Sequence, residues 1–419
     1  MTAVTVDPEL YSDLQRHGAG DVSACFSCGT CTATCPLVSD DANFPRRLIR
    51  YAQVGMRDEL LASKELWTCY NCGECSESCP TGAEPGEFMA AARRYAIGRY
   101  DRTGLARLFY TRTLVGTLVA IGMALFFALF MYAGRGPQDS ETLDIFGFIP
   151  EPLIHNIGIV VMILVFAAGL LGVATMMRSV GRVEGVSARS MVAGPLALLQ
   201  SARALWDALV VETLGQQRYR RDCDADADVD ADPDPDADPW YRRRWLLHAA
   251  TMWGFLGLLA ATILDYGLAI VGIKETGTPV PIWYPVRLLG TVAGIALVYG
   301  ATMLMVRRYQ KRDRSVRQSS ASDWLLLWLV WITGVTGFVL ELALYLPNAP
   351  AWGYWVFLFH VAVAMELVIL APFMKLAHAV YRPLALFYQA LGRERAKDDE
   401  ASASAGVSSL PGSTIKTEV

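Results

Sequence analysis

Two stretches of sequence decide the fold of the first part of this chain, CFSCGTCTATCP at residues 25–36 and CYNCGECSESCP at residues 69–80. Each follows the spacing C-x2-C-x2-C-x3-C-P, which is typical of proteins that hold iron-sulfur clusters. The short spacings let three thiolates converge on one [4Fe-4S] cluster, and the fourth cysteine normally reaches the other cluster. The sequence therefore predicts two [4Fe-4S] clusters.

This pattern assigns four cysteine ligands to each cluster. The ligands are expected to be Cys25, Cys28, Cys31 and Cys79 for the first, and Cys69, Cys72, Cys75 and Cys35 for the second. A pair of zinc sites is the alternative, because C-x2-C pairs also bind zinc. Four cysteines per motif and the following proline argue against zinc. The 33 residues between Cys35 and Cys69 leave room for helices, which predicts a helical ferredoxin-like domain over residues 1–112.

The rest of the chain is apolar enough to cross a membrane. Hydrophobic residues make up 53% of the 419 positions, which is high for a soluble protein. Six segments reach the roughly 20 residues that a membrane-spanning helix needs, at residues 113–133, 153–177, 245–273, 285–306, 323–346 and 353–379. The predicted fold is all-α, with the two-cluster domain followed by a six-helix transmembrane bundle of the cytochrome b type at residues 113–392.

The distribution of basic residues predicts how this bundle is oriented. Ten arginines lie from Arg178 to Arg244 and six Lys or Arg from Arg307 to Ser322, whereas the opposite loops hold only Arg135 and Lys274. Positive residues favour the cytoplasmic side, so we expect a multi-pass protein of the cell membrane with both termini in the cytoplasm. No signal peptide is visible before the first apolar segment, which agrees with cytoplasmic clusters.

Two other segments are singled out by their composition. Residues 195–214 carry an apolar stripe of Leu198, Leu205, Trp206 and Leu209, which predicts a helix that lies on the membrane or a partner, or a simple surface helix. Nine aspartates alternate from Asp222 to Asp238, and residues 222–239 are predicted to be a disordered insertion. The tail at residues 393–419 is also predicted to be disordered.

Four of the five histidines fall in or beside the apolar segments. Ionisable groups are costly in a bilayer and are usually functional there. His248 begins the third segment on the cytoplasmic side and His378 ends the sixth, so these two are predicted to be axial ligands of a haem b. His155 and His360 are predicted to hold a second haem b nearer the outer side.

The spacing of the last two membrane histidines supports stacked sites. His360 and His378 are 18 residues apart, which in one continuous helix is about 27 Å and places them on one face. The alternative for each membrane histidine is a hydrogen-bonded interfacial residue. His17 is expected on the surface of the soluble domain.

Three carboxylates also lie at membrane depth, Asp265, Glu341 and Glu366. Carboxylates there are suited to a proton path or a quinone site, because quinone chemistry moves protons with electrons. For Asp265 and Glu341 the alternative is a location at the membrane–water interface without such a role, whereas Glu366 lies deeper in the membrane.

Several of these motifs resemble known families. The cysteine motifs resemble the small iron-sulfur subunit of heterodisulfide reductases. The membrane half resembles the cytochrome b subunit of these enzymes and of respiratory nitrate reductase, through Gln217 to Cys223, Asp323-Trp324, Thr336-Gly337-Phe338 and KLAHAVYR at residues 375–382. The presence of both halves in one chain is similar to the fused iron-sulfur and cytochrome b subunit of the quinone-interacting membrane-bound oxidoreductase.

The resemblance implies a function in electron transfer. It implies two [4Fe-4S] clusters, one or two haems b, exchange of electrons with a menaquinone-type pool, and a cytoplasmic flavoprotein or iron-sulfur partner that carries out the chemistry on the soluble substrate. The chain would be an oxidoreductase subunit with no nucleic-acid partner. The alternatives are a membrane-tethered redox sensor or non-quinone electron donor, and a transporter-like bundle with an appended ferredoxin, which would require broken helices in repeated halves.

Overall fold

The structure is a computed structural model that describes residues 5–38, 44–223, 239–275, 280–311, 316, 319–346 and 350–408. Every regular element in these ranges is a helix, so the prediction of an all-α fold is confirmed. The N-terminal part contains α1 (Leu10–Arg16), η1 (Val22–Ala24), α2 (Thr30–Ala33), α3 (Arg46–Gln53), α4 (Arg57–Ala62), α5 (Glu65–Thr68), α6 (Glu74–Glu77), α7 (Pro85–Tyr100) and α8 (Leu105–Thr111).

Six helices in the described ranges are long and apolar enough to cross a membrane, as predicted. They are α9 (Thr113–Ala133), α11 (Glu151–Val183), α15 (Arg244–Ile270), α16 (Pro285–Tyr309), α17 (Ala321–Tyr345) and α18 (Ala351–Leu370). The remaining elements are α10 (Ile145–Phe148), α12 (Ala188–Met191), α13 (Pro195–Trp206), η2 (Asp207–Leu214), α14 (Gln217–Cys223), η3 (Trp240–Arg242), η5 (Lys375–Ala377) and α19 (His378–Ser408).

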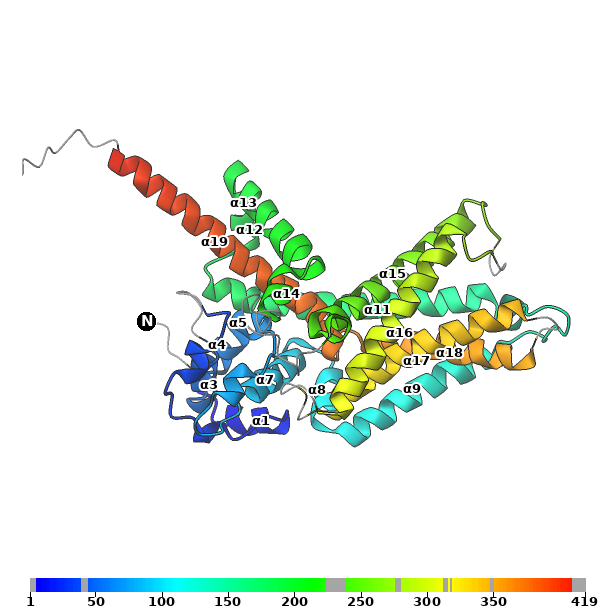
Figure 1. The fold of residues 1–419 in the computed structure, drawn as a ribbon, viewed down its shortest axis with the longest axis horizontal. Coiled ribbons are helices and arrows are strands. Elements are labelled where there is room, and N and C mark those ends of the chain that lie inside the picture. The colour runs from blue at the N-terminus through cyan, green and yellow to red at the C-terminus, as the bar shows by residue number, and fades with distance from the viewer. Residues whose placement is uncertain are drawn as a thin grey trace, which may run out of the picture.

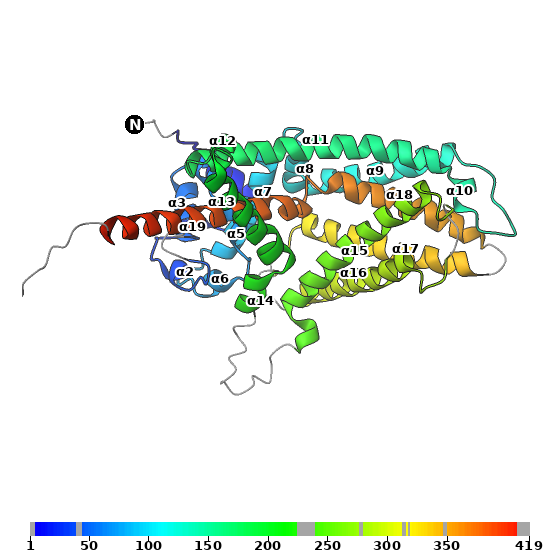
Figure 2. The same ribbon diagram turned by 90° about the horizontal axis from the view of Figure 1, so that it is seen from above.

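The six long helices lie side by side, and the N-terminal helices gather at one end of them (Figure 1). Helices α12, α13, α14 and α19 lie at this same end, as the view from above also shows (Figure 2). The outer surface of the bundle is apolar, with side chains such as Leu118 and Phe166 more than half exposed. Lipid would cover such a surface, because it provides no polar groups for water. Helix α18 is the most enclosed span, with 50% of its apolar window buried against 11% for α11.

The last predicted span is shorter than the sequence suggests. The hydrophobic pattern predicts one helix over residues 353–379, but α18 ends at Leu370 and a new helix, α19, starts at His378. Pro372 explains the break, because proline has no backbone N–H and disfavours helical geometry in the residue before it. His360 and His378 therefore belong to different helices, and the 27 Å spacing along one helix face does not apply.

The predicted helix at residues 195–214 forms as α13 followed by the π-helical η2. It packs against α19, and the side-chain amide of Gln200 donates a hydrogen bond to Asp398. Leu198, Trp206 and the other stripe residues stay exposed. Helix α19 continues to Ser408, where the sequence predicts disorder from residue 393; residues 409–419 lie outside the described residues. Most of the predicted Asp-rich insertion, residues 224–238, lies outside the described residues.

The N-terminal helices share one core with the bundle. Buried Leu48 and Phe88 belong to the same cluster as Met176 of α11, Ala204 of α13 and Leu391 of α19. Because α11 has 33 residues and so runs for about 50 Å, it is longer than the ~30 Å apolar layer of a membrane. The C-terminal end of this helix is thus part of the core that the N-terminal helices build.

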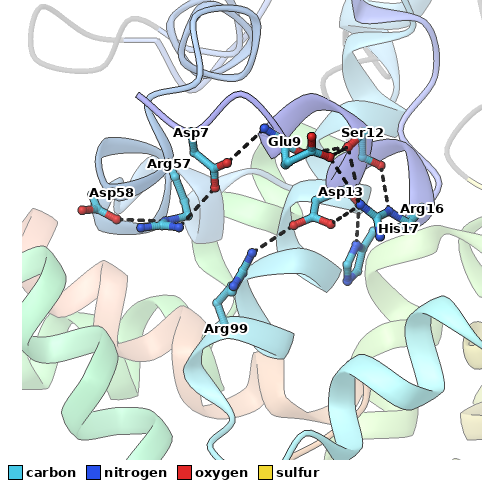
Figure 3. A network of polar contacts seen from close by, with 9 residues as sticks. All are labelled: Asp7, Glu9, Ser12, Asp13, Arg16, His17, Arg57, Asp58 and Arg99. Carbon is cyan, nitrogen blue, oxygen red and sulfur yellow. Dashed lines mark hydrogen bonds and ion pairs between the residues drawn. The ribbon is translucent and has the colours of Figure 1, made fainter. Parts of the chain in front are cut away.

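Polar contacts fix helix α1 on this core (Figure 3). Asp13 pairs with Arg99 of α7 at 2.9 Å, and Asp7 pairs with Arg57 of α4 at 3.1 Å. The prediction that His17 lies on the surface is wrong, because it is only 6% exposed and packs edge-on against Tyr95 at 5.4 Å. Its Nδ1 lies 2.7 Å from the carbonyl oxygen of Asp13, which satisfies one ring nitrogen in the interior.

His17 should make the stability of the N-terminal part depend on pH. Burial lowers its pKa below the ordinary 6.5, so as the pH falls through 6.5 the unfolded chain takes up a proton that the folded chain does not. Stability should therefore fall with pH until the folded pKa is passed. We expect the melting temperature to drop between about pH 7.5 and pH 5.5 by less in His17→Gln than in the wild type; equal drops would contradict this role.

Candidate functional site

The two cysteine motifs form loops of the same backbone shape. Ser27 and Asn71 have φ values of 62° and 59°, and the glycines two positions later, Gly29 and Gly73, have φ values of 92° and 94°. Glycine is favoured there because a side chain strains the left-handed conformation. After each glycine a short helix, α2 or α6, begins. The identical shape means that each loop presents its cysteines in the same way.

The structure groups the eight cysteines in two sets. The thiol of Cys31 interacts electrostatically with those of Cys25, Cys28 and Cys79. Cys35, Cys69, Cys72 and Cys75 line one small hollow. In this grouping the cysteine before each proline lies with the cysteines of the other motif. Ligation of one cluster by each set stays a prediction. Backbone amides approach the sulfurs as well, that of Asn71 at 3.3 Å from Cys69 Sγ and that of Ala83 at 3.4 Å from Cys79 Sγ.

Four cysteines in each set match the number of ligands of a [4Fe-4S] cluster, in which each thiolate binds a different iron. Within the described ranges, no group of three His, Cys, Asp or Glu side chains is placed to hold a single metal ion. Burial raises the pKa of Cys35 to about 12 and raises that of Cys75 as well, so loading these sites must release protons.

The loop of the second set is fastened to the membrane half by two arginines. Arg382 of α19 donates to the carbonyl oxygens of Trp67, Thr68 and Cys69 through one nitrogen, each at 3.1 Å. Its guanidinium also lies 5.1 Å from the centre of the Tyr70 ring. Arg244, at the start of α15, donates to the carbonyl oxygen of Asn71 at 3.2 Å. The loop therefore rests on the two helices that carry His248 and His378.

His248 and His378 face each other next to this loop. Their ring centres are 6.2 Å apart, and metal–nitrogen bonds of about 2 Å would place two imidazoles on one iron at roughly this separation. His248 Nδ1 lies 3.3 Å from Gln216 Oε1, and His378 Nδ1 lies 2.6 Å from the carbonyl oxygen of Lys375. Such contacts orient metal-binding histidines and leave Nε2 for the metal. The pair thus fits a haem iron, and ligation itself stays a prediction.

Aromatic rings connect the cysteine loop with these histidines. The Tyr70 ring lies 5.3 Å from that of Tyr219 in α14, which lies 5.8 Å from the ring of His248. With His378 the four rings form a continuous series from the residue after Cys69 to the centre of the histidine pair.

A buried carboxylate joins the same parts of the chain. Asp323, at the start of α17, is 8% exposed and pairs with Lys375 at 3.1 Å, Arg308 at 3.6 Å and Arg94 of α7 at 4.0 Å. Its side chain also forms a reciprocal cap with Ser320. Buried charges require such partners, so the ends of α16 and α17, the segment before His378 and the N-terminal part are fixed together.

The outer histidine pair is not brought into contact. The ring of His155 lies 4.7 Å from that of Tyr266, and its Nδ1 is 3.6 Å from Glu151. His360 Nδ1 lies 2.9 Å from Thr336 Oγ1, beside Gly337. Both histidines are in the described part of the chain, where no ring contact joins them. The outer haem stays a prediction with weaker geometry than the inner one.

The three membrane carboxylates differ in their surroundings. Asp265 pairs with Lys274 at 2.6 Å, and Glu341 pairs with Arg287 at 2.5 Å, which agrees with an interfacial location for both. Glu366 is 3% exposed in the last third of α18, and no ion pair to it occurs among the described residues. It is the carboxylate whose burial calls for a functional reason.

Comparison with known proteins agrees with this two-part organisation. A family model described as a 4Fe-4S dicluster domain matches residues 21–83. A second, described as citrate utilization protein B, matches residues 150–400, which is more than half of the chain. The chain belongs to the citrate utilization protein B family. No solved structure matches it.

Individual relatives cover only parts of the chain. One subunit of the H(2):CoB-CoM heterodisulfide,ferredoxin reductase of Methanothermobacter thermautotrophicus is 36% identical over 62 residues, 15% of this chain and 34% of that protein. The iron-sulfur subunit of the CoB--CoM heterodisulfide reductase of Methanopyrus kandleri is 44% identical over 46 residues, 11% and 24% of the two chains. Citrate utilization protein B of Escherichia coli is 28% identical over 158 residues, 37% and 39%.

These matches support one of the two resemblances predicted from the sequence and do not test the other. The likeness of the cysteine motifs to the small subunit of heterodisulfide reductases is confirmed. The chain spans well under half the length of each of these relatives. The likeness of the membrane half to cytochrome b subunits stays a prediction.

Several residues of the site were not found by sequence reasoning. Gln216, Tyr219 and Arg382 lie in or beside stretches that carried the family likeness, but nothing in their spacing indicated contacts with His248 or with the loop at Cys69. Pro372 was a readable signal for the end of α18. The contact between the loop and Arg382 joins residues more than 300 positions apart, which no local pattern reports.

The crossed arrangement of the fourth cysteines predicts separate effects of two variants. Cys35→Ser should impair the cluster at Cys69, Cys72 and Cys75, and Cys79→Ser the other cluster, because each removes one ligand of four. Iron and acid-labile sulfide should fall from about eight to about four per chain, with different electron paramagnetic resonance signals lost in the two variants. Cys223→Ser is the matched control and should keep both. Stoichiometric zinc in the wild type would contradict the assignment.

Removing the Arg382 contacts should loosen one loop selectively. Each hydrogen bond from a charged donor contributes about 1.5–3 kcal/mol, so Arg382→Gln should release iron from the second cluster to a chelator about tenfold faster or more. Arg393→Gln on the same helix is the control, since Arg393 pairs only with a surface carboxylate at 3.2 Å among the described residues. Equal release from both variants would show that Arg382 does not hold the loop.

Proposed function

We propose that this chain is the membrane-bound electron-transfer subunit of an oxidoreductase. It passes electrons between a cytoplasmic redox partner and the membrane quinone pool, through two [4Fe-4S] clusters and haem b. The observation that carries the proposal is that Arg244 and Arg382 hold the second cysteine loop on the two helices that carry His248 and His378, at one end of an apolar bundle. The heterodisulfide reductase subunits that match this loop support a partner subunit.

The residues of the chain serve this function by fixing positions. When bound, the clusters and the haem supply one-electron redox chemistry that side chains cannot provide. Arg382 and Arg244 hold the loop against α19 and α15. Gln216 and the carbonyl oxygen of Lys375 orient the two imidazoles. The rings of Tyr70 and Tyr219 lie between the loop and His248.

Glu366 is the residue that we propose to exchange protons near the quinone. Burial away from any ion-pair partner in the described chain favours the neutral form of a carboxylic acid. Such a group can take up and return a proton within the membrane, as quinone reduction or oxidation demands. The carboxylates Asp265 and Glu341 are less suited, because each is already engaged in an ion pair, with Lys274 and Arg287 respectively.

The orientation belongs to this proposal. Helices α12, α13 and α14 and the N-terminal part lie at the end of the bundle where the arginine-rich connection lies. By the positive-inside rule this end faces the cytoplasm, so electrons would be exchanged with the soluble partner there.

Loss of haem in histidine variants tests the inner site. In membranes that contain the wild type, a reduced-minus-oxidised spectrum should show b-type haem. His248→Ala and His378→Ala should each lose most of one haem, because an iron left with one imidazole binds weakly. His17→Gln, outside the bundle, is the control. Full haem in His378→Ala would exclude that residue as a ligand.

Reduction by a quinol tests the proposed exchange of electrons with the membrane quinone pool. Addition of menadiol to anaerobic membranes should reduce the haem, and Glu366→Gln should slow this reaction about tenfold or more while leaving the haem spectrum unchanged. The redox-sensor alternative predicts intact cofactors that menadiol does not reduce. That result would contradict the quinone-linked function and favour a function as a redox sensor.

A further inference from the structure

A hollow of about 980 Å³ opens beside the first cysteine loop. It lies between this loop and helix α3, and Cys25, Phe26, Arg46, Arg50 and Tyr51 contribute to its lining. Of the eight cysteines only Cys25 is among its lining residues, so the hollow adjoins the first cysteine set without being enclosed by it. It therefore calls for an occupant of its own.

The charge of this hollow is positive. Three arginines of α3 line it, and no Asp or Glu is among the lining residues. Arg47 is paired with Glu65, whereas within the described part of the chain no carboxylate pairs with Arg46 or Arg50. The neighbouring Asp21 is engaged by the hydroxyl groups of Tyr11 and Ser23.

An aromatic side chain stands at the edge of the hollow. Phe26 follows the first cysteine ligand and is 66% exposed. Arginines and aromatic residues are the side chains that contribute most to protein–protein contacts. In the first set Cys28 is exposed, whereas Cys31 of that set and Cys75 of the second set are buried. The loop of the second set is held against the membrane half by Arg382 and Arg244.

The hollow is also built on fixed backbone. The Gln53 side chain of α3 donates to the carbonyl oxygens of Val22 at 2.9 Å and Cys25 at 2.8 Å. The guanidinium of Arg46 lies next to Gly29, where a side chain would displace it. Helix α3 and the cysteine loop therefore present the arginines and Phe26 as one preorganised surface, which lowers the entropic cost of binding.

We propose that this surface, formed by Phe26, Arg46 and Arg50, is where the acidic face of the cytoplasmic redox partner docks. The inference rests on the proposed function and assigns the two cysteine sets different neighbours: the first set faces the soluble partner, and the second faces the histidines of the bundle. An interface of this kind is small and is guided by charge, as is typical of transient electron-transfer contacts.

The rate of reduction by an acidic electron-transfer protein tests the docking surface. Dithionite-reduced plant-type ferredoxin is the probe, and bleaching of the clusters in the full-length protein is followed by anaerobic stopped flow. The wild-type rate should fall as ionic strength rises, because salt screens the attraction. Arg46→Glu with Arg50→Glu should slow the reaction about tenfold or more at low salt, and Phe26→Ser should slow it at all salt concentrations.

Matched controls separate docking from damage to the clusters. Arg102→Glu with Arg189→Glu changes the net charge equally at two other exposed positions and should keep the wild-type rate. Reduced methyl viologen, a small cation, should reduce every variant at least as fast as the wild type, and iron and sulfide contents should be unchanged. Equal slowing in both double variants, or no slowing in either, would overturn the proposal.

The outcome can be told apart from a failure of the proposed function. Menadiol reduces the haem from within the membrane, so this reaction does not involve the docking surface. If menadiol reduces the haem but ferredoxin reacts equally with all variants, the docking surface is wrong and the quinone-linked function stands. If ferredoxin discriminates but menadiol does not react, the docking surface stands without the quinone.

Discussion

The guanidinium of Arg382 holds the second cysteine loop on the helix that begins with His378. It donates to three successive carbonyl groups in front of the second cysteine loop, and it lies one helical turn after His378. Electron transfer requires redox sites to be close, and this contact fixes the distance between the loop and the histidine pair. Since the guanidinium group is planar and always charged, the contact fixes both the position and the orientation of the loop.

Asp323 places a second restraint around the same point. Three cations from α7, α16 and η5 surround one buried carboxylate, so a shift of the N-terminal part relative to the bundle would leave a charge without its partner. Breaking such buried pairs costs about 3–5 kcal/mol. Arg382 and Asp323 lie on either side of His378 in sequence. Their contacts together restrict the position of the His378 ring.

The sequence could predict what depends on local spacing. The cysteine pattern, the six apolar segments and the pairing of His248 with His378 all follow from short-range periodicity and from the alternation of helices across a membrane. The break at Pro372 was missed because hydrophobicity continued through it. Burial of His17 and the contacts of Arg382, Tyr219 and Gln216 depend on tertiary packing between distant segments, which neither composition nor periodicity encodes.

The break between α18 and α19 has a consequence for how the protein is made. His378 begins the last helix, which packs on helices α5 and α11 and on α13 and η2. The N-terminal domain is synthesised first, before any span is inserted, yet its second loop receives the Arg382 contacts only after the final span has left the ribosome. Assembly of the inner histidine pair is therefore a late step, and the second cysteine loop gains its contacts with Arg382 only then.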